Sequence, residues 1–199
     1  MKQPRTRHQH DIEVKRSRFL ATLLPMTREA ELKALQQELK QQHPKASHVC
    51  YGARWMTSEG QIQESFSDDG EPSGTSGPPI LKVLQHKSLI NCGVLITRYF
   101  GGTKLGTGGL QRAYSQATSD LIQTLSPDTV EPWIATSVVS LRTTFANEAD
   151  LRHALAQLNV TITEERYGAD GPCLYADMTE PQREALALLP IARLTTTTS

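Results

Sequence analysis

The segment SPDTVEP, residues 126–132, separates two parts of the chain that each have regularly spaced apolar residues. Its two prolines and its turn-forming residues favour an irregular connection over a helix or a strand. A chain of 199 residues is long enough for two small domains. We therefore predict an N-terminal domain over residues 1–128 and a C-terminal domain over residues 129–199.

Strand and helix patterns alternate through the N-terminal part. The strand patterns cover residues 13–26, 47–56, 60–66 and 92–100. A helix follows the first strand, with Leu32, Leu35 and Leu39 on one face and Thr27 in position to cap it. Two further helices are predicted over residues 78–85 and 110–125, the first opened by two prolines, which suit a first helical turn.

The C-terminal part follows the order strand, helix, strand, strand, helix, strand. Its strand patterns cover residues 133–145, 159–165, 171–178 and 191–194. One helix follows Asn147 and a second covers residues 181–189. This order is typical of the ferredoxin-like arrangement. The two parts together predict an α+β protein.

Composition excludes several classes of protein. Lys plus Arg equals Asp plus Glu, at 21 each, which argues against a surface built throughout for nucleic acid but does not exclude a local basic patch. No segment approaches the roughly 20 apolar residues of a membrane span, and the opening residues contain no apolar run. The three cysteines are widely spaced, as in reduced cytoplasmic proteins. We expect a cytoplasmic protein.

The glycine-rich segment GGTKLGTG, residues 101–108, has only part of a phosphate-binding pattern. A P-loop needs Lys directly after its second glycine, where this chain has Thr107, and the dinucleotide fingerprint fails at Gln111. A tight turn between a strand and a helix explains the glycines better. The start of that helix is still a candidate anion site, because backbone N–H groups are unpaired there. Three cations lie near it in sequence: Arg98, Lys104 and Arg112.

An acidic cluster lies in FSDDGEPSGTSGPP, residues 66–79. Asp68, Asp69 and Glu71 do not have the spacing of a calcium-binding loop, although a magnesium site with one or two carboxylates stays open. Alternatively, these carboxylates hold the loop against Arg98 or Arg112, or cap loop amides, since partly buried charges need partners. We favour this second interpretation and predict no metal site and no cofactor.

Nucleophilic catalysis has little support in the sequence. No nucleophile-elbow pattern surrounds Ser73, Thr75 or Ser76. His48 and Cys50 lie two apart on a predicted strand, where neighbouring side chains rarely come into hydrogen-bond contact. We predict no catalytic residue.

Four segments taken together resemble the IMPACT family, called the YigZ family in bacteria. They are KRSRF (15–19), SHVCYGA (47–53), SDDGEPSGTSGPPIL (67–81) and TRYFGGTKLGTGGLQRAY (97–114). The match spans most of residues 13–125, and residues 133–194 look like the C-terminal domain of bacterial members. The chain departs from the usual pattern at Ser76 and at Thr103–Lys104.

The resemblance implies an N-terminal α/β domain that is like domain 2 of ribosomal protein S5, and a ferredoxin-like βαββαβ C-terminal domain. The latter is similar to elongation-factor domains that contact the ribosome. Eukaryotic IMPACT proteins regulate translation through protein–protein contact. The family pattern establishes no catalytic activity.

We therefore predict a non-enzymatic, cytoplasmic protein linked to the regulation of translation. Its expected partner is the ribosome, RNA or a translation-associated protein, with no membrane binding and no reading of DNA sequence. Two alternatives stay open: an enzyme of the S5 domain 2-like class that binds a nucleotide with magnesium, and a pure protein-interaction adaptor.

The predicted binding residues belong to two loops that each lead into a helix. They are Asp68, Asp69, Gly70, Glu71, Pro72, Ser73, Gly74, Thr75, Arg98, Tyr99, Phe100, Gly101, Gly102, Lys104, Gly106, Gly108, Gly109 and Arg112. On this hypothesis both helix N-termini point outward. For Tyr99 and Phe100, the sequence supports two interpretations equally: the rings are buried at the end of the strand, or they stack on a base. Arg98→Glu or Arg112→Glu is expected to weaken binding without unfolding the protein.

Overall fold

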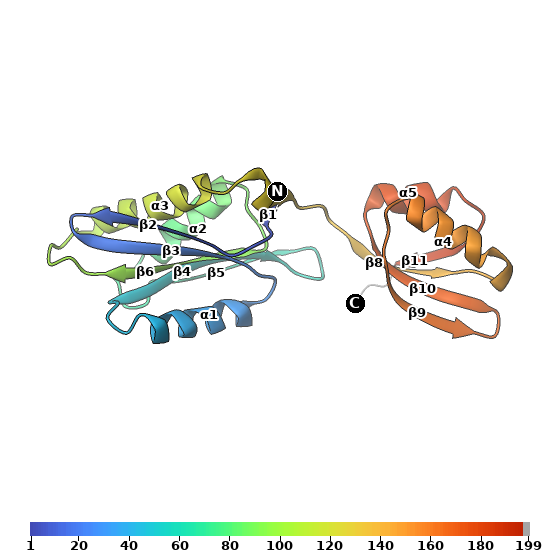
Figure 1. Ribbon diagram of the computed structural model, residues 1–199, viewed down its shortest axis with the longest axis horizontal. Helices are drawn as coiled ribbons and strands as arrows, with labels where there is room; N and C mark the ends of the chain where they lie inside the picture. Colours follow the sequence, from blue (N-terminus) through green and yellow to red (C-terminus); the bar gives the residue numbers. More distant parts are fainter. Residues whose placement is uncertain (197–199) are drawn as a thin grey trace. The chain divides into compact units, whose positions relative to one another are not determined.

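The structure is a computed structural model that describes residues 1–196 (Figure 1). The chain divides into two units, Met1–Trp133 and Ile134–Ser199. The division therefore follows Trp133, five residues after the boundary that the linker pattern suggested. The reason is that the short strand β7 (Val130–Pro132) pairs with β1 (Lys2–Pro4) and so belongs to the first unit.

The first unit contains a five-stranded antiparallel sheet with the order β2-β3-β6-β4-β5. Its strands are β2 (His8–Val14), β3 (Ser17–Pro25), β4 (His48–Met56), β5 (Ile62–Ser67) and β6 (Cys92–Tyr99). Strand β6 lies at the centre of the sheet, which explains its continuous apolar run, because both of its faces are covered.

Helices cover both faces of this sheet (Figure 1). Helix α1 (Glu29–Gln42) packs on one face through Leu32, Leu35 and Leu39, as their spacing predicted. Thr27 does not cap it: the helix begins after Arg28, and no side chain caps its N-terminus. Helices α2 (Gly77–His86) and α3 (Thr107–Gln123) pack side by side on the other face.

The second unit contains a four-stranded antiparallel sheet with the order β11-β8-β10-β9. Its elements follow the predicted β-α-β-β-α-β order. They are β8 (Ser137–Arg142), α4 (Glu148–Gln157), β9 (Ile162–Gly168), β10 (Gly171–Met178), α5 (Glu180–Ala187) and β11 (Arg193–Thr196). Both helices pack on one face of the sheet, over a core that includes Val139, Leu141 and Leu174. The α+β class predicted from the sequence is therefore confirmed.

Short 3-10 helices precede β7 and α4, at Pro127–Thr129 and Phe145–Asn147. Within residues 1–196, no helix is long and apolar enough to cross a membrane.

Candidate functional site

The two loops singled out in the sequence lie next to each other in the first unit. One follows β5 and leads into α2, and the other follows β6 and leads into α3. The side-chain Nε2 of Gln111, in the second turn of α3, donates to the carbonyl of Gly74 at 3.3 Å. Strands β5 and β6 are not neighbours in the sheet, so the packing of α2 against α3 brings their loops together.

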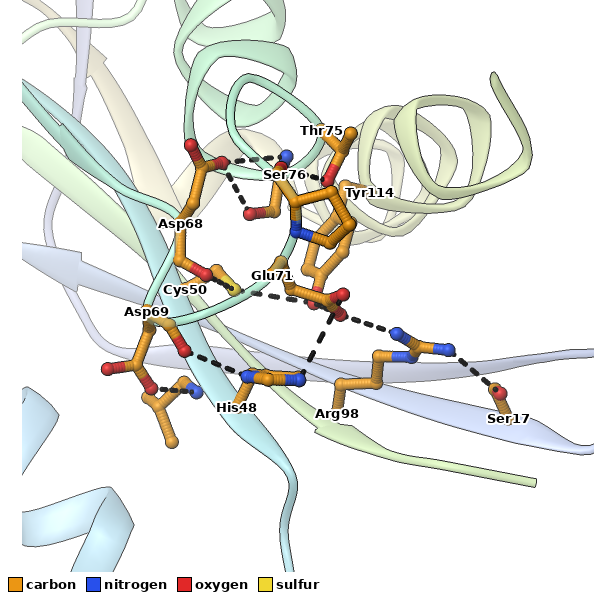
Figure 2. A network of polar contacts seen from close by, with 12 residues as sticks. Ser17, His48, Cys50, Asp68, Asp69, Glu71, Thr75, Ser76, Arg98 and Tyr114 are labelled. Atoms are coloured by element: carbon orange, nitrogen blue, oxygen red, sulfur yellow. Dashed lines mark hydrogen bonds and ion pairs between the residues drawn. The ribbon is translucent and has the colours of Figure 1, made fainter. Parts of the chain in front are cut away.

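Asp68 holds the first loop in shape through four hydrogen bonds, of which Figure 2 draws those to Ser76. Its Oδ1 accepts from the hydroxyl and the amide of Ser76, at 2.7 and 3.0 Å, and from the amide of Gly77, at 2.9 Å. Its Oδ2 accepts from the amide of Gly74 at 2.8 Å. Partial burial raises the pKa of Asp68, but these hydrogen bonds outweigh it and lower the pKa, so the carboxylate stays ionised.

The N-terminus of α2 is therefore closed to a ligand. Asp68 already occupies the amides of Ser76 and Gly77, and Pro78 and Pro79 have no N–H to offer. The expectation that both helix N-termini point outward is wrong for α2.

The N-terminus of α3 is open by contrast. Gly106 precedes it with a φ of 70°, which favours glycine, and no side chain caps the helix. No acidic residue lies in its first turn. Arg112 folds back over that turn, because a Cβ placed on Gly108 would lie 3.7 Å from Nη1 of Arg112. Amides and a guanidinium thus lie together at this helix start.

Asp69 binds neither of the arginines that the sequence suggested for the acidic cluster. Its Oδ1 forms an ion pair with Nζ of Lys40 on α1 at 2.5 Å, and its Oδ2 accepts from the amide of Val49 at 2.7 Å. Nδ1 of His48 donates to the Asp69 carbonyl at 2.8 Å. Asp69 therefore joins the loop to β4 and α1, a contact that depends on the tertiary fold.

Glu71 and Arg98 form a buried ion pair beneath the loop (Figure 2). Their side chains are only 3% and 6% exposed, and Oε1 of Glu71 lies 2.5 Å from Nη1 of Arg98. The same oxygen accepts from the hydroxyl of Tyr114 at 2.8 Å. Nε2 of His48 lies 4.0 Å from Oε2 of Glu71.

Arg98 is consequently an interior residue and not part of the surface. Its guanidinium lies 5.5 Å from the ring centre of Phe19 and 5.7 Å from that of Phe100. Its Nη2 is 3.5 Å from Oγ of Ser17, and its Nε has no hydrogen-bond partner among the described residues. The continuous apolar run of β6 carried this signal, because both faces of a central strand are covered and Arg98 lies within that strand.

Tyr114 and Cys50 also belong to this network, although no local pattern predicted that they would lie there. Sγ of Cys50 lies 3.0 Å from the carbonyl of Asp68 and 3.3 Å from the hydroxyl of Tyr114. Burial raises the pKa of Cys50 to about 12 and also raises the pKa of Tyr114. A thiol with that pKa is protonated at neutral pH and is a weak nucleophile.

The predicted site residues thus divide into three groups by exposure. Glu71, Thr75 and Arg98 are buried. Partly buried are Asp68, Asp69, Gly74, Tyr99, Gly101 and Gly109. Exposed are Gly70, Pro72, Ser73, Phe100, Gly102, Lys104, Gly106, Gly108 and Arg112.

Tyr99 and Phe100 differ in their suitability for stacking on a ligand. The hydroxyl of Tyr99 lies 2.7 Å from Nδ1 of His43, so this ring is tied to the α1 side of the sheet. Phe100 is 50% exposed. We call the exposed Pro72, Ser73, Phe100, Lys104 and Arg112 the loop surface; neither of its cations has an ion-pair partner within residues 1–196.

Comparisons with known proteins identify relatives of the whole chain and of its first unit. The family model of the Impact N-terminal domain matches residues 15–122. The chain is 41% identical over 112 residues to the IMPACT family member YvyE of Bacillus subtilis, covering 56% of this chain and 51% of YvyE. It thus spans about half the length of that relative. An IMPACT family member of Thermus thermophilus is 34% identical over 82% of this chain and 92% of its own.

Two solved structures also align with the chain. A crystal structure of a hypothetical protein is 26% identical, with a TM-score of 0.71 over 100% of this chain and 96% of its own. The structure of the two-domain translational regulator Yih1 is 26% identical over 57% of this chain and 44% of its own. The TM-score of that second alignment, 0.39, is too low to support an argument.

Proposed function

Because this chain belongs to the IMPACT family, we propose that it is a translation-linked binding protein that acts without catalysis. One observation carries the proposal. The carboxylates of Asp68, Asp69 and Glu71 all bind groups within the protein. The side chains of Lys104, Arg112 and Phe100 are exposed to solvent. The proposed partner surface is the loop surface together with the start of α3.

The internal contacts argue against the alternative of an enzyme that binds a nucleotide with magnesium. Such an enzyme would need carboxylate oxygens of Asp68, Asp69 or Glu71 for the ion. Asp68 already accepts four hydrogen bonds, Asp69 binds Lys40, and Glu71 is buried against Arg98. Each metal contact would have to replace one of these interactions, which stabilise the loop.

The loop surface is suited to an anionic partner. Lys104 and Arg112 form no ion pair among the residues that the structure describes, and the open N-terminus of α3, with no acidic residue in its first turn, adds the positive end of a helix dipole. Phe100 adds an exposed ring at the same loop. We propose the ribosome as the partner, since its surface offers phosphates beside protein.

We also propose specific folds for the two units. The helix arrangement around the first sheet is consistent with an S5 domain 2-like fold. The β-α-β-β-α-β order and the antiparallel strand order β11-β8-β10-β9 support a ferredoxin-like fold for the second unit.

Co-sedimentation with ribosomes and with separated subunits, over a series of salt concentrations, tests the proposal. We expect Lys104→Glu and Arg112→Glu to weaken binding, and binding of the wild type to fall as salt rises. Arg28→Glu is the matched control, because Arg28 is 81% exposed at the start of α1, on the opposite face of the sheet.

Other outcomes would favour the alternatives. If the affinity for ribosomes does not change with salt concentration, a protein-interaction adaptor is favoured. If the protein binds ribosomes at no salt concentration, the proposal is contradicted. Stabilisation by a nucleotide with magnesium, of about 2.7 kcal/mol at 100 times the Kd, would favour the enzyme.

A further inference from the structure

The sheet of the second unit has one face that no other element of this unit covers (Figure 1). Helices α4 and α5 pack on the face that carries Val139, Leu141 and Leu174. Because side chains alternate along a strand, the residues between these point to the opposite face. We call that side the open face; its central residues are Ser140, Arg142, Cys173 and Tyr175.

Three arginines lie in one row across the open face. Arg193 pairs with Arg142, Arg142 pairs with Cys173, and Cys173 pairs with Arg166. The row thus crosses all four strands, from β11 through β8 and β10 to β9. Neighbouring strands are about 4.8 Å apart, so the three arginines start within roughly 15 Å of each other.

Two of these arginines form no ion pair within residues 1–196. Like charges directly opposite each other on neighbouring strands destabilise a sheet, and Arg142 lies directly opposite Arg193. Neither forms an ion pair within the described part of the chain, whereas Arg166 pairs with Glu164 at 2.7 Å. An anion bound over the row would remove this repulsion.

Two pockets in the surface of the second unit share Arg142 as a lining residue. One hollow, of about 400 Å³, is lined by Arg142, Arg166 and Tyr175, and another, of about 520 Å³, by Arg142 and Arg193. Asp170, in the turn between β9 and β10, also lines both hollows and is the acidic residue that they share. Asp177 lies two rows away from Arg142, opposite Val138.

An aromatic residue lies beside the arginine row. Tyr175 is in the adjacent row of β10, and the guanidinium of Arg166 lies 5.3 Å from its ring centre. Unpaired nucleic-acid bases stack on aromatic rings and on guanidinium planes of this kind. An acidic peptide would use the arginines but would leave this stack unused.

We propose that the open face binds single-stranded RNA, with Arg142 and Arg193 on phosphates and the Tyr175–Arg166 stack against a base. A single strand is required because the bases of a duplex cannot reach a side chain in this way. The choice of RNA over DNA rests on the proposed link to translation. The site itself is separate from the loop surface and does not depend on it.

The test is fluorescence anisotropy of a labelled 12-nucleotide RNA of mixed sequence with the full chain, in rising salt. Arg142→Gln with Arg193→Gln should weaken binding about tenfold or more near 0.1 M salt and reduce the salt slope by about 1.4, since each phosphate contact on a single strand contributes about 0.7. The matched control is Arg28→Gln with Lys33→Gln, which removes two exposed charges at α1.

A second variant tests the stack. Tyr175→Ala should weaken binding roughly fivefold or more with little change in the salt slope, because stacking releases no counterions. Tyr175→Phe keeps the ring and should bind like the wild type. Thermal melts check the fold, and the double arginine variant should melt no lower than the wild type because it removes a repulsion.

Several results would overturn the inference. They are no binding of the wild type at 50 mM salt, unchanged binding by the double arginine variant, or equal affinity for an acidic peptide. Equal binding of single-stranded DNA would overturn the choice of RNA. If Lys104→Glu abolishes RNA binding while the double arginine variant retains it, the RNA site is the loop surface. Loss of ribosome binding alone, with the open face still binding RNA, would contradict only the proposed function.

Discussion

At the scale of single residues, the charges in the two loops have different roles according to their burial. Arg98 and Glu71 are an interior pair, whereas Lys104 and Arg112 face solvent. A charge-reversal experiment on Arg98 would therefore report on folding and not on binding. The exposed cations are the appropriate positions for testing the proposed function.

Removing one member of the buried pair should destabilise the protein. Arg98→Met leaves Glu71 buried without its partner, which costs about 3–5 kcal/mol. Urea unfolding measures the free energy of unfolding, and Arg112→Met is the control, expected within about 0.5 kcal/mol of the wild type. Adding Glu71→Leu to Arg98→Met should recover much of the loss. If Arg98→Met and Arg112→Met had the same free energy of unfolding, the Glu71–Arg98 pair would not stabilise the fold.

Asp68 should make stability depend on pH in the acid range. Its pKa is lowered in the folded protein, so its contribution is present above the unfolded value of about 3.9 and is lost as the pH falls through the folded value. Asp68→Asn should cost about 1–2 kcal/mol at pH 7, as for loss of a helix cap, and should flatten the acid limb of the stability curve. Urea midpoints from pH 7 down to pH 3 measure both effects. An unchanged acid limb in the variant would assign the pH dependence to other groups.

At the scale of elements, the loop after β6 is held against the turn between β2 and β3. A Cβ on Gly101 would lie 2.0 Å from the carbonyl carbon of Arg16, and the amide of Gly101 donates to Oγ of Ser17 at 3.2 Å. This close approach explains why a glycine is required there. The loop surface therefore depends on the β2–β3 hairpin, which is far away in sequence.

Two glycine substitutions in this loop and helix should act in opposite directions. Gly101→Ala forces backbone to move and should cost about 1–3 kcal/mol, as overpacking does. Gly108→Ala adds a methyl in a helix without a close backbone contact and should stabilise by about 0.5–1 kcal/mol. Thermal or urea unfolding of the two variants measures the difference. If Gly101→Ala also left the free energy of unfolding unchanged or raised it, the loop would be able to move away from Arg16 without cost.

At the scale of the whole molecule, the boundary between the units follows strand pairing more closely than local composition. The residues after the 3-10 helix return to β1, where Glu131 accepts from Nε2 of Gln3 and Nε of Arg5, both at 2.7 Å. The N-terminal strand is thereby held at the end of the first unit. Residues 129–133 are thus part of that unit.

Two fragments should differ in stability for this reason. A fragment of residues 1–133 keeps the β1–β7 pairing, whereas a fragment of residues 1–128 loses it. We expect the longer fragment to have the higher Tm, by a few degrees, since a loss of about 1 kcal/mol shifts Tm by roughly 2–8 °C in domains of this size range. Glu131→Gln in the longer fragment is the control for the ion pair alone. Equal melting of both fragments would place the boundary at residue 128 after all.

Local pattern missed β1 and β7, and it predicted one strand over residues 13–26, where β2 ends and β3 begins. It was sufficient for the α+β class, for the element order of the second unit and for the two loops. Apolar spacing and turn residues report on a few neighbouring positions, and these features depend only on such positions. The sequence predicted Arg98 or Arg112 as the partner of the acidic cluster, and the pairing of Glu71 with Arg98 confirms this. The pairing of Asp69 with Lys40 needed the tertiary fold, because these two residues lie on different elements. The arginine row is of the same kind: Arg142, Arg166 and Arg193 are unremarkable along the chain and come together only through the register of four strands.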